Sequence, residues 1–168
     1  LDKKRAEEIV LHAFEPVPST AKMFRDRIAG HPGHEVVEFH QIAMSDTSGV
    51  AEIGVFADGA GTNSLHYAAD ERVPEKRVEV ALDSLDVFCE GNSIDHVHMI
   101  KCDTEGHDAK VLQGARRLLE RESIDVLQFE YNHRWVFGRA FLKDVFDLVG
   151  ELPYEVVRVQ EQGVTVFD

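Results

Sequence analysis

Cysteine is scarce in this sequence, with two residues among 168. The two, Cys89 and Cys102, have neither the spacing of a metal site nor that of a disulfide framework. Cys102 lies within an apolar segment, where a free cysteine behaves as a small hydrophobic core residue. We therefore expect neither thiolate metal ligands nor a scaffold held together by disulfides.

Long apolar runs and an excess of basic residues are missing as well. No run approaches the ~20 apolar residues that span a membrane, and residues 1–8 are too charged for a signal peptide. The 31 acidic and 18 basic residues give a formal net charge of −13, which disfavours binding to nucleic-acid phosphates or to an anionic membrane surface. We expect no nucleic-acid partner, no membrane partner and a cytoplasmic location, and leave the oligomeric state open.

The length suits one domain, and the 43% of hydrophobic residues can fill a core. No internal repeat, linker or low-complexity segment divides the chain. Residues 1–168 are therefore interpreted as a single domain. Within it, short apolar segments alternate with amphipathic ones, which is the pattern of strands followed by helices.

The expected elements follow from this periodicity. Strands are expected at residues 9–14, 36–39, 50–56, 78–82, 94–100 and 124–130. Helices are expected at residues 1–8, 18–29, 83–88, 108–119 and 138–150, with Ser19 or Thr20 as the cap of the second. A polar turn is expected at 41–49, a loop at 62–74, and an antiparallel hairpin at 154–159 and 164–167. This order implies a mainly parallel α/β sheet with helices on both faces and the hairpin at one edge.

The stretch of residues 99–108 carries the clearest chemical signal. It combines the end of a buried strand, a tight turn and the start of a helix, and Asp103 and Glu105 follow the strand directly. In open α/β sheets this is where ligands bind. Acidic residues at the start of a helix also suit the helix dipole, which explains Asp108 equally well.

A second strand-end carboxylate is Glu15, which precedes Pro16, a residue that stops strand pairing. In an α/β chain, such a carboxylate commonly accepts hydrogen bonds from both ribose hydroxyls of a nucleoside. A solvated glutamate is the more common role at a strand end. Glu130 ends a later strand and precedes a polar and aromatic cluster at residues 131–135.

Three segments of the chain, taken together, match a known family pattern. They are Ala-Phe-Glu-Pro at 13–16, Ala-Met-Ser-Asp at 43–46 with Gly49, and Ile-Lys-Cys-Asp-Thr-Glu-Gly at 100–106 followed by Val-Leu-Gln-Gly-Ala at 111–115. In that order they resemble the FkbM-type S-adenosylmethionine-dependent methyltransferases. The resemblance covers nearly the whole chain from Val10 onward. The family usually has glutamate where this chain has Asp108, so this carboxylate reaches less far.

The resemblance implies a class I methyltransferase fold, which is Rossmann-like, and S-adenosylmethionine as the cofactor. It implies that Glu15 binds the ribose hydroxyls of the cofactor. Gln41, Ile42 and Ala43 would border the adenine. Members of the family commonly methylate hydroxyl oxygens of small natural products or sugars, so a small-molecule acceptor is expected.

The same resemblance implies the catalytic residues. Asp103 would face the methyl group and the acceptor, Glu105 would lie beside it, and Glu130 and His133 would help to form the acceptor pocket. Methyl transfer is an in-line displacement, so holding the two reactants in line supplies much of the catalysis. An alcohol also benefits from a general base, for which His107, His133 and Asp103 are candidates. A surface or core-edge role is the more common one for each histidine.

Three alternatives stay open. Asp103, Glu130 and Asn132 could supply hard oxygen ligands of the kind that Mg²⁺ prefers, as in metal-dependent catechol-type O-methyltransferases. The spacing around Glu130 is looser than theirs, so no metal ligand is assigned. The second alternative is a non-catalytic binding or scaffold domain that kept the fold. The third is a nucleotide-binding oxidoreductase, because Glu15 would bind the ribose of NAD equally well.

One part of the family pattern is missing from the chain, namely the first central strand with its glycine-rich turn. The strand at residues 9–14 already corresponds to the second strand of that fold. In the family's sheet, the missing strand separates the strand that ends at Glu15 from the one that ends at Asp103. Its absence would leave unpaired backbone groups that cost about 1–3 kcal/mol each. We therefore expect the domain to be truncated at its N-terminus, with that strand upstream of Leu1.

Overall fold

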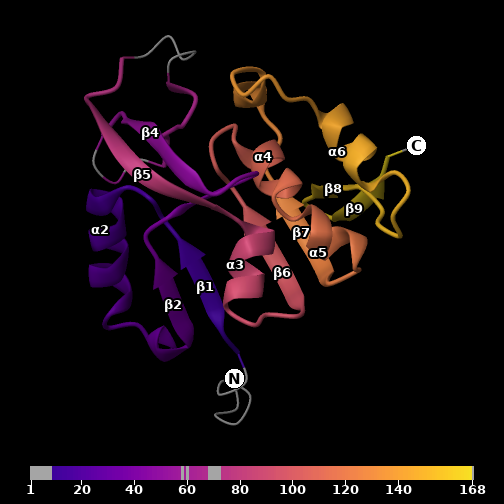
Figure 1. Ribbon diagram of the computed structural model, residues 1–168, viewed down its shortest axis with the longest axis horizontal. Helices are drawn as coiled ribbons and strands as arrows, with labels where there is room; N and C mark the ends of the chain where they lie inside the picture. Colours follow the sequence, from indigo (N-terminus) through magenta and orange to yellow (C-terminus); the bar gives the residue numbers. More distant parts are fainter. Residues whose placement is uncertain (1–8, 58, 60, 68–72, 168) are drawn as a thin grey trace.

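The computed structural model of the chain describes residues 9–57, 59, 61–67 and 73–167 (Figure 1). The helix end expected at residues 1–8, and part of the loop expected at 62–74, lie outside these ranges. The elements are β1 (Leu11–Phe14), α2 (Pro18–Ile28), η1 (His34–Val36), β2 (Val37–His40), β3 (Ala43–Ser45), β4 (Gly49–Val55), β5 (Lys76–Ser84), α3 (Leu85–Gly91), β6 (Val97–Cys102), α4 (Asp108–Gln113), α5 (Arg116–Glu120), β7 (Ile124–Phe129), η3 (His133–Val136), α6 (Leu142–Val149), β8 (Val157–Gln160) and β9 (Gly163–Val166).

The strands form four small sheets instead of the single sheet that the sequence predicts. β1 pairs with β2 and β6 with β7, both in parallel, as expected for an α/β chain. A third sheet has the order β3-β5-β4, with β3 parallel and β4 antiparallel to β5. The predicted hairpin is present as β8-β9, but it pairs with no other described strand, so its predicted place at a sheet edge is wrong.

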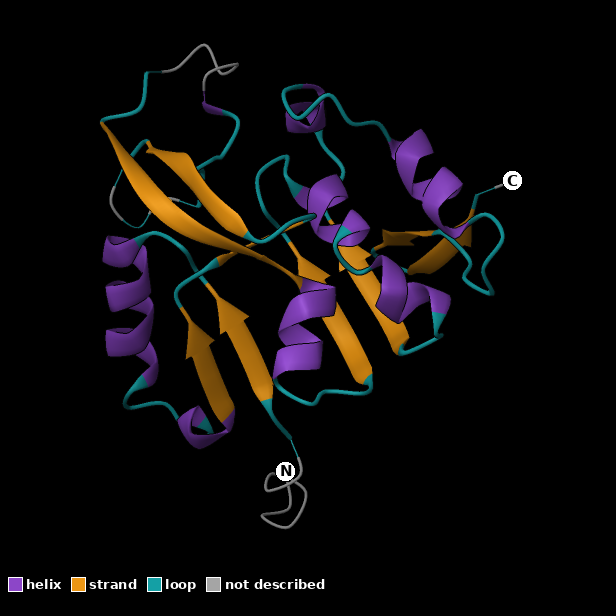
Figure 2. Cartoon of the chain, in the orientation of Figure 1, coloured by secondary structure: helices purple, strands orange, loops and turns teal. Residues whose placement is uncertain are grey.

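An interruption between β1 and β6 separates the two parallel strand pairs. Within the described ranges, β1 pairs only with β2 and β6 only with β7. Figures 1 and 2 show the two pairs in the same half of the molecule, with α3 over the space between β1 and β6. Leu11 and Met99, on these two strands, are 53% and 58% exposed. The mixed α/β class is therefore confirmed, whereas a continuous Rossmann-like sheet is not seen.

Helix α2 begins as its sequence requires, but without the predicted cap. Pro18 occupies the first turn, and no side chain caps the helix, so the prediction of Ser19 or Thr20 as cap is wrong. Proline has no N–H to satisfy and its φ already suits a helix, so the first turn needs less help from a cap. The residue before it, Val17, is fully buried and anchors the helix start in the core.

The helix predicted at residues 108–119 is in fact two helices, α4 and α5, which are separated at Gly114 and Ala115. A Cβ on Gly114 would lie 2.0 Å from the Ser45 carbonyl oxygen of β3, so only glycine allows this close approach. The Gly114 carbonyl accepts the Asp86 N–H at 2.8 Å. The break therefore results from packing against β3 and α3, which local periodicity does not encode.

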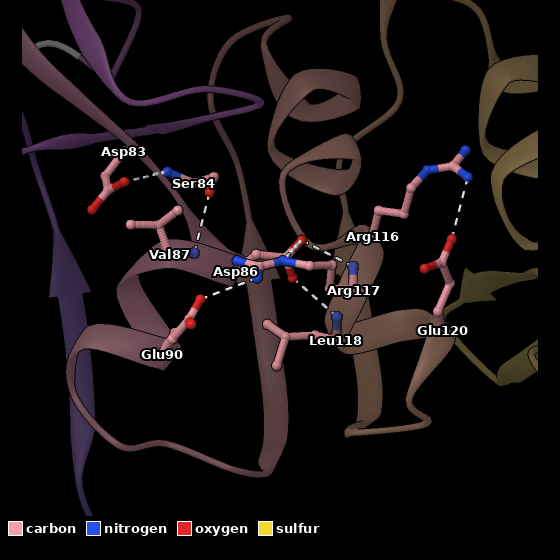
Figure 3. Close-up of polar contacts among 9 residues, drawn as sticks. All are labelled: Asp83, Ser84, Asp86, Val87, Glu90, Arg116, Arg117, Leu118 and Glu120. Carbon is pink, nitrogen blue, oxygen red and sulfur yellow. Dashed lines mark hydrogen bonds and ion pairs between the residues drawn. The ribbon is translucent and has the colours of Figure 1, made fainter.

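Asp86 of α3 takes the place of an N-cap for α5. Its carboxylate accepts the backbone N–H groups of Arg117 and Leu118 at 2.9 and 3.0 Å (Figure 3). α5 has no capping side chain of its own, since Ala115 precedes it. A carboxylate at this position satisfies unpaired N–H groups and suits the helix dipole. α3 and α5 are thereby joined through a partly buried polar contact.

Strand β3 (Ala43–Ser45) lies within the polar turn predicted at residues 41–49, of which residues 46–48 form a bend. Ala43 to Ser45 pair in parallel with Leu82 to Ser84 of β5. All three residues of β3 are buried. Because the partner strand lies far away in the sequence, this three-residue segment gives no local sign of a strand.

The core lies mainly between β6-β7 and the helices α3, α4, α5 and α6. It includes Trp135, Leu118 and Ala115, none of which is exposed. Cys102 is 5% exposed within it, which confirms its predicted role as a core residue. No described helix is long and apolar enough to cross a membrane.

Replacing Asp86 by alanine is expected to lower the free energy of unfolding by about 1–3 kcal/mol, because two N–H groups of α5 lose their acceptor. Asp86→Asn keeps one acceptor oxygen and should lose less. Urea denaturation followed by circular dichroism measures both. Glu90→Ala is the control, since the exposed Glu90–Arg117 pair at 3.0 Å contributes only about 0–1 kcal/mol. Equal losses for Asp86→Ala and Glu90→Ala would contradict this role of Asp86.

Candidate functional site

A cleft of about 1320 Å³ separates β1 from β6 and extends to the carboxyl ends of both strands. Most of the residues that the sequence predicts for the site line this cleft. They are Glu15, Ile42, Ala43, Asp103, Glu105 and the candidate general base His107. The cleft is thus lined by residues of β1, β3 and β6, which are far apart in the chain.

Three other predicted site residues do not line the cleft. Gln41 is exposed between β2 and β3, and Glu130 is exposed at the end of β7. His133 is exposed in η3, with its ring edge-on to Phe137 at 6.2 Å between centroids. Their roles in binding adenine and acceptor stay predictions.

Glu15 is held at the tip of β1 by two backbone contacts. Its N–H donates to the His40 carbonyl at 3.1 Å, and its Oε1 accepts the Val17 N–H at 2.8 Å. Burial raises the pKa of this carboxyl above its usual value, and the Val17 hydrogen bond partly opposes that effect. In the described part of the chain, the second oxygen, Oε2, accepts no hydrogen bond. It is therefore available to a ligand in the cleft.

Asp103 lies at the end of β6 and is exposed. Its Oδ2 forms an ion pair with Lys101 Nζ at 3.0 Å, and both side chains are about half exposed. Such a pair adds little to stability. The carboxylate is thus a solvent-accessible charged group on the cleft wall, as expected of a group that meets a substrate.

Glu105 is fixed more firmly than Asp103. Its Oε2 pairs with Arg134 Nε at 3.1 Å, with only 19% and 14% of the two side chains exposed. Burial raises the pKa of Glu105, against the opposing charge of Arg134. Glu105 itself has a φ of 54° and Gly106 a φ of 97°, and a Cβ on Gly106 would lie 2.6 Å from the Arg134 carbonyl. The turn therefore requires glycine at position 106 and packs directly on η3. The sequence did not reveal that Arg134 is the residue that this turn contacts.

Asp108 has a structural role that the sequence reasoning missed. It is fully buried and accepts the Thr104 hydroxyl at 2.8 Å. It also accepts the backbone N–H groups of Thr104 and Glu130, each at 3.3 Å. The carboxylate joins the turn after β6 to the end of β7, so its location at a helix start is only part of its role. In the sequence, the only feature that relates to the Asp108–Thr104 contact is that Thr104 precedes Asp108 by four residues.

His107 belongs to a buried hydrogen-bonded chain. Its Nε2 lies 2.9 Å from Ser45 Oγ and its Nδ1 lies 3.1 Å from His66 Nε2. Burial, and then the nearby His66, lower the pKa of His107 to about 4. The ring is neutral at pH 7, but both nitrogens are engaged. Structural contacts thus engage both ring nitrogens of His107, which the sequence predicts as a candidate general base. The sequence did not indicate that His66 is a partner of His107.

The magnesium ligands considered above are not assembled. Asn132 Oδ1 accepts the Arg134 N–H at 2.9 Å as the cap of η3, so this oxygen is directed at the backbone. Among the described residues, neither of the two groups of histidine and acidic side chains with three possible ligand atoms within 4.8 Å of one another contains Asp103 or Glu130.

Comparison with known proteins identifies the family of the chain. Residues 1–156 match the family described as the Methyltransferase FkbM domain. No curated protein and no solved structure matches the chain. The family match spans most of the chain and includes every residue that lines the cleft.

The low pKa of His107 predicts a pH dependence of stability. The unfolded chain, with a usual histidine pKa of 6.5, binds a proton between pH 6.5 and 4 that the folded chain does not. Stability should therefore fall as the pH drops through this window, by about 2 kcal/mol at pH 5 from this group alone. Urea denaturation at pH 7 and pH 5 should show a smaller difference for His107→Gln than for the wild type. Exposed His31→Gln is the control, and an unchanged pH difference in His107→Gln would refute the assignment.

Proposed function

The chain belongs to the FkbM methyltransferase family, and from this premise we propose that it is an S-adenosylmethionine-dependent methyltransferase that acts on a hydroxyl group of a small molecule or sugar. The observation that carries the proposal is that Glu15 and Asp103, which follow the carboxyl ends of β1 and β6, line one cleft. Ligands of open α/β folds bind at such strand ends. The cytoplasm remains the predicted place of action.

The β1 side of the cleft fits the adenosine part of the cofactor. Glu15 Oε2 is open to two hydroxyl donors, which is the requirement for binding a ribose. Ile42 and Ala43 add an apolar surface beside it, suited to a purine edge. When bound, S-adenosylmethionine supplies an electrophilic methyl group on a sulfonium. The residues of the β1 side would orient that group toward β6.

The β6 side carries the groups suited to the acceptor. Asp103 is accessible and would accept the proton that the acceptor hydroxyl loses on methylation. Glu105 is held by Arg134 and would orient the acceptor next to Asp103. Positioning of two reactants in line contributes much of the rate in such a displacement.

The size and walls of the cleft support a class I domain with one further central strand. Ligand pockets usually measure about 300–1,000 Å³, and this cleft is larger. Its walls include two strand edges that pair with no described strand. We propose that residues 1–168 belong to one domain, in which a strand from outside the described residues lies between β1 and β6 and completes the cofactor site.

A non-catalytic binding domain is the second candidate. The observation that favours it is the interrupted sheet, since no described segment supplies a glycine-rich turn between β1 and β6. Such a domain would still bind a nucleoside through Glu15 but would not transfer a methyl group. Binding and turnover therefore have to be measured separately.

For binding, Glu15→Gln is expected to weaken the affinity for S-adenosylmethionine at least about tenfold, because hydrogen bonds to a charged acceptor are worth about 1.5–3 kcal/mol each. Isothermal titration calorimetry measures the dissociation constant. Glu35→Gln, on the exposed face of η1, is the matched control and should bind like the wild type. Equal affinities of the Glu15→Gln variant and the wild type would remove Glu15 from the cofactor site.

For turnover, Asp103→Asn is expected to lower kcat by about 100-fold or more, since general-base catalysis contributes about 10²–10⁴-fold. Release of S-adenosylhomocysteine in the presence of a panel of monosaccharides and phenols measures this. Asp95→Asn, before the other end of β6, is the control. Wild-type turnover by Asp103→Asn would refute its catalytic role, and cofactor binding without turnover in the wild type would favour the binding domain.

A further inference from the structure

Two histidines and a glutamate converge on the face of the β1-β2 sheet that Phe88 covers. His12 lies on β1, and Glu38 and His40 lie on β2. The parallel register pairs His12 with Glu38 and Phe14 with His40. Side chains two residues apart on a strand point to the same face, so Glu38 and His40 flank His12. The sequence did not indicate this cluster, since 28 positions separate the two histidines.

The possible ligand atoms lie close to one another around His12. Its Nδ1 is 3.0 Å from His40 Nε2 and 3.5 Å from Glu38 Oε2. All three atoms lie within 4.8 Å of one another. In a tetrahedral zinc site with bonds of about 2.0–2.1 Å, ligand atoms are about 3.3 Å apart. The two short separations therefore differ little from those around a bound ion.

The surroundings hold the two imidazole rings in place. Phe88, a buried residue of α3, lies edge-on to His12 and to His40, with centroid distances of 5.3 and 4.8 Å. Phe14 stacks on His40 at 5.1 Å. Packing of this kind limits the rotation of ligating side chains, which is how a metal site is preorganised.

A second cluster of the same donor types serves as an internal comparison. His96, His98 and Asp125 also bring three possible ligand atoms within 4.8 Å, but all three residues are exposed. Among the described residues, its histidine rings contact each other and no ring of another residue. Without an aromatic wall, these side chains have to be ordered by the ion itself, which costs conformational entropy. The cluster on β1 and β2 is thus the better site.

We propose that His12, Glu38 and His40 bind a zinc ion that cross-links β1 to β2. Two imidazole nitrogens and one carboxylate oxygen form a donor set that suits zinc, and three protein ligands leave one position for water. Glu38 is the exposed ligand, with 59% of its side chain accessible, which gives the ion a route of entry. The site does not rest on the proposed methyl transfer, because it includes neither Glu15 nor Asp103.

Zinc titration of the tag-free, EDTA-stripped protein tests the proposal. Calorimetry with zinc chloride should give one tight equivalent, and cobalt(II) should give the visible absorption of a tetrahedral complex. His12→Gln, Glu38→Gln and His40→Gln should each weaken zinc binding at least about tenfold. The double variant His96→Gln/His98→Gln and the single variant His31→Gln should keep the wild-type affinity.

Melting temperatures with and without zinc separate loss of the site from loss of the fold. The wild type should melt at a higher temperature with zinc, because a ligand that binds only the folded state stabilises it. Glu38→Gln changes an exposed side chain and should fold normally yet show no such rise. The proposal is overturned if micromolar zinc does not bind. It is equally overturned if Glu38→Gln binds like the wild type, or if only the His96→Gln/His98→Gln variant loses binding.

Discussion

The arrangement of the site depends on the buried carboxylate of Asp108. A buried charge is tolerated only when hydrogen bonds replace its hydration. Asp108 obtains them from the Thr104 hydroxyl and from the N–H groups of Thr104 and Glu130. These contacts place the turn after β6 against the end of β7. Trp135 reinforces the same junction, since its Nε1 donates to the Glu130 carbonyl at 2.7 Å.

Two further contacts connect this junction to the cleft. The Glu105–Arg134 pair joins the turn to η3, and Gly106 permits the close approach of the two backbones. His107 joins the turn to β3 through Ser45. The residues between Asp103 and Asp108 are thereby held on three sides, which leaves Asp103 as the accessible carboxylate on the β6 wall. A rigid turn that presents one exposed acid is suited to positioning a reactant.

Much of the fold could be predicted from local pattern, and the failures have a common cause. The strands that end at Phe14 and Phe129 follow from short apolar runs, and α2 follows from Pro18 and its apolar stripe. Strand β3 was missed because its pairing partner is β5. The division of α4 from α5 was missed because Gly114 meets the Ser45 carbonyl. In both cases, contacts between distant segments outweigh the local preference.

The sequence by itself determined the family, the α/β class and the carboxylates at the strand ends, because motifs and periodicity are local properties of the chain. Tertiary structure decided which of these residues share a cleft, and it placed Glu15, Asp103 and Glu105 there while leaving Gln41 and His133 outside. It also decided that Asp108 is a buried acceptor. Register between parallel strands, which no local signal encodes, brings His12 next to Glu38 and His40.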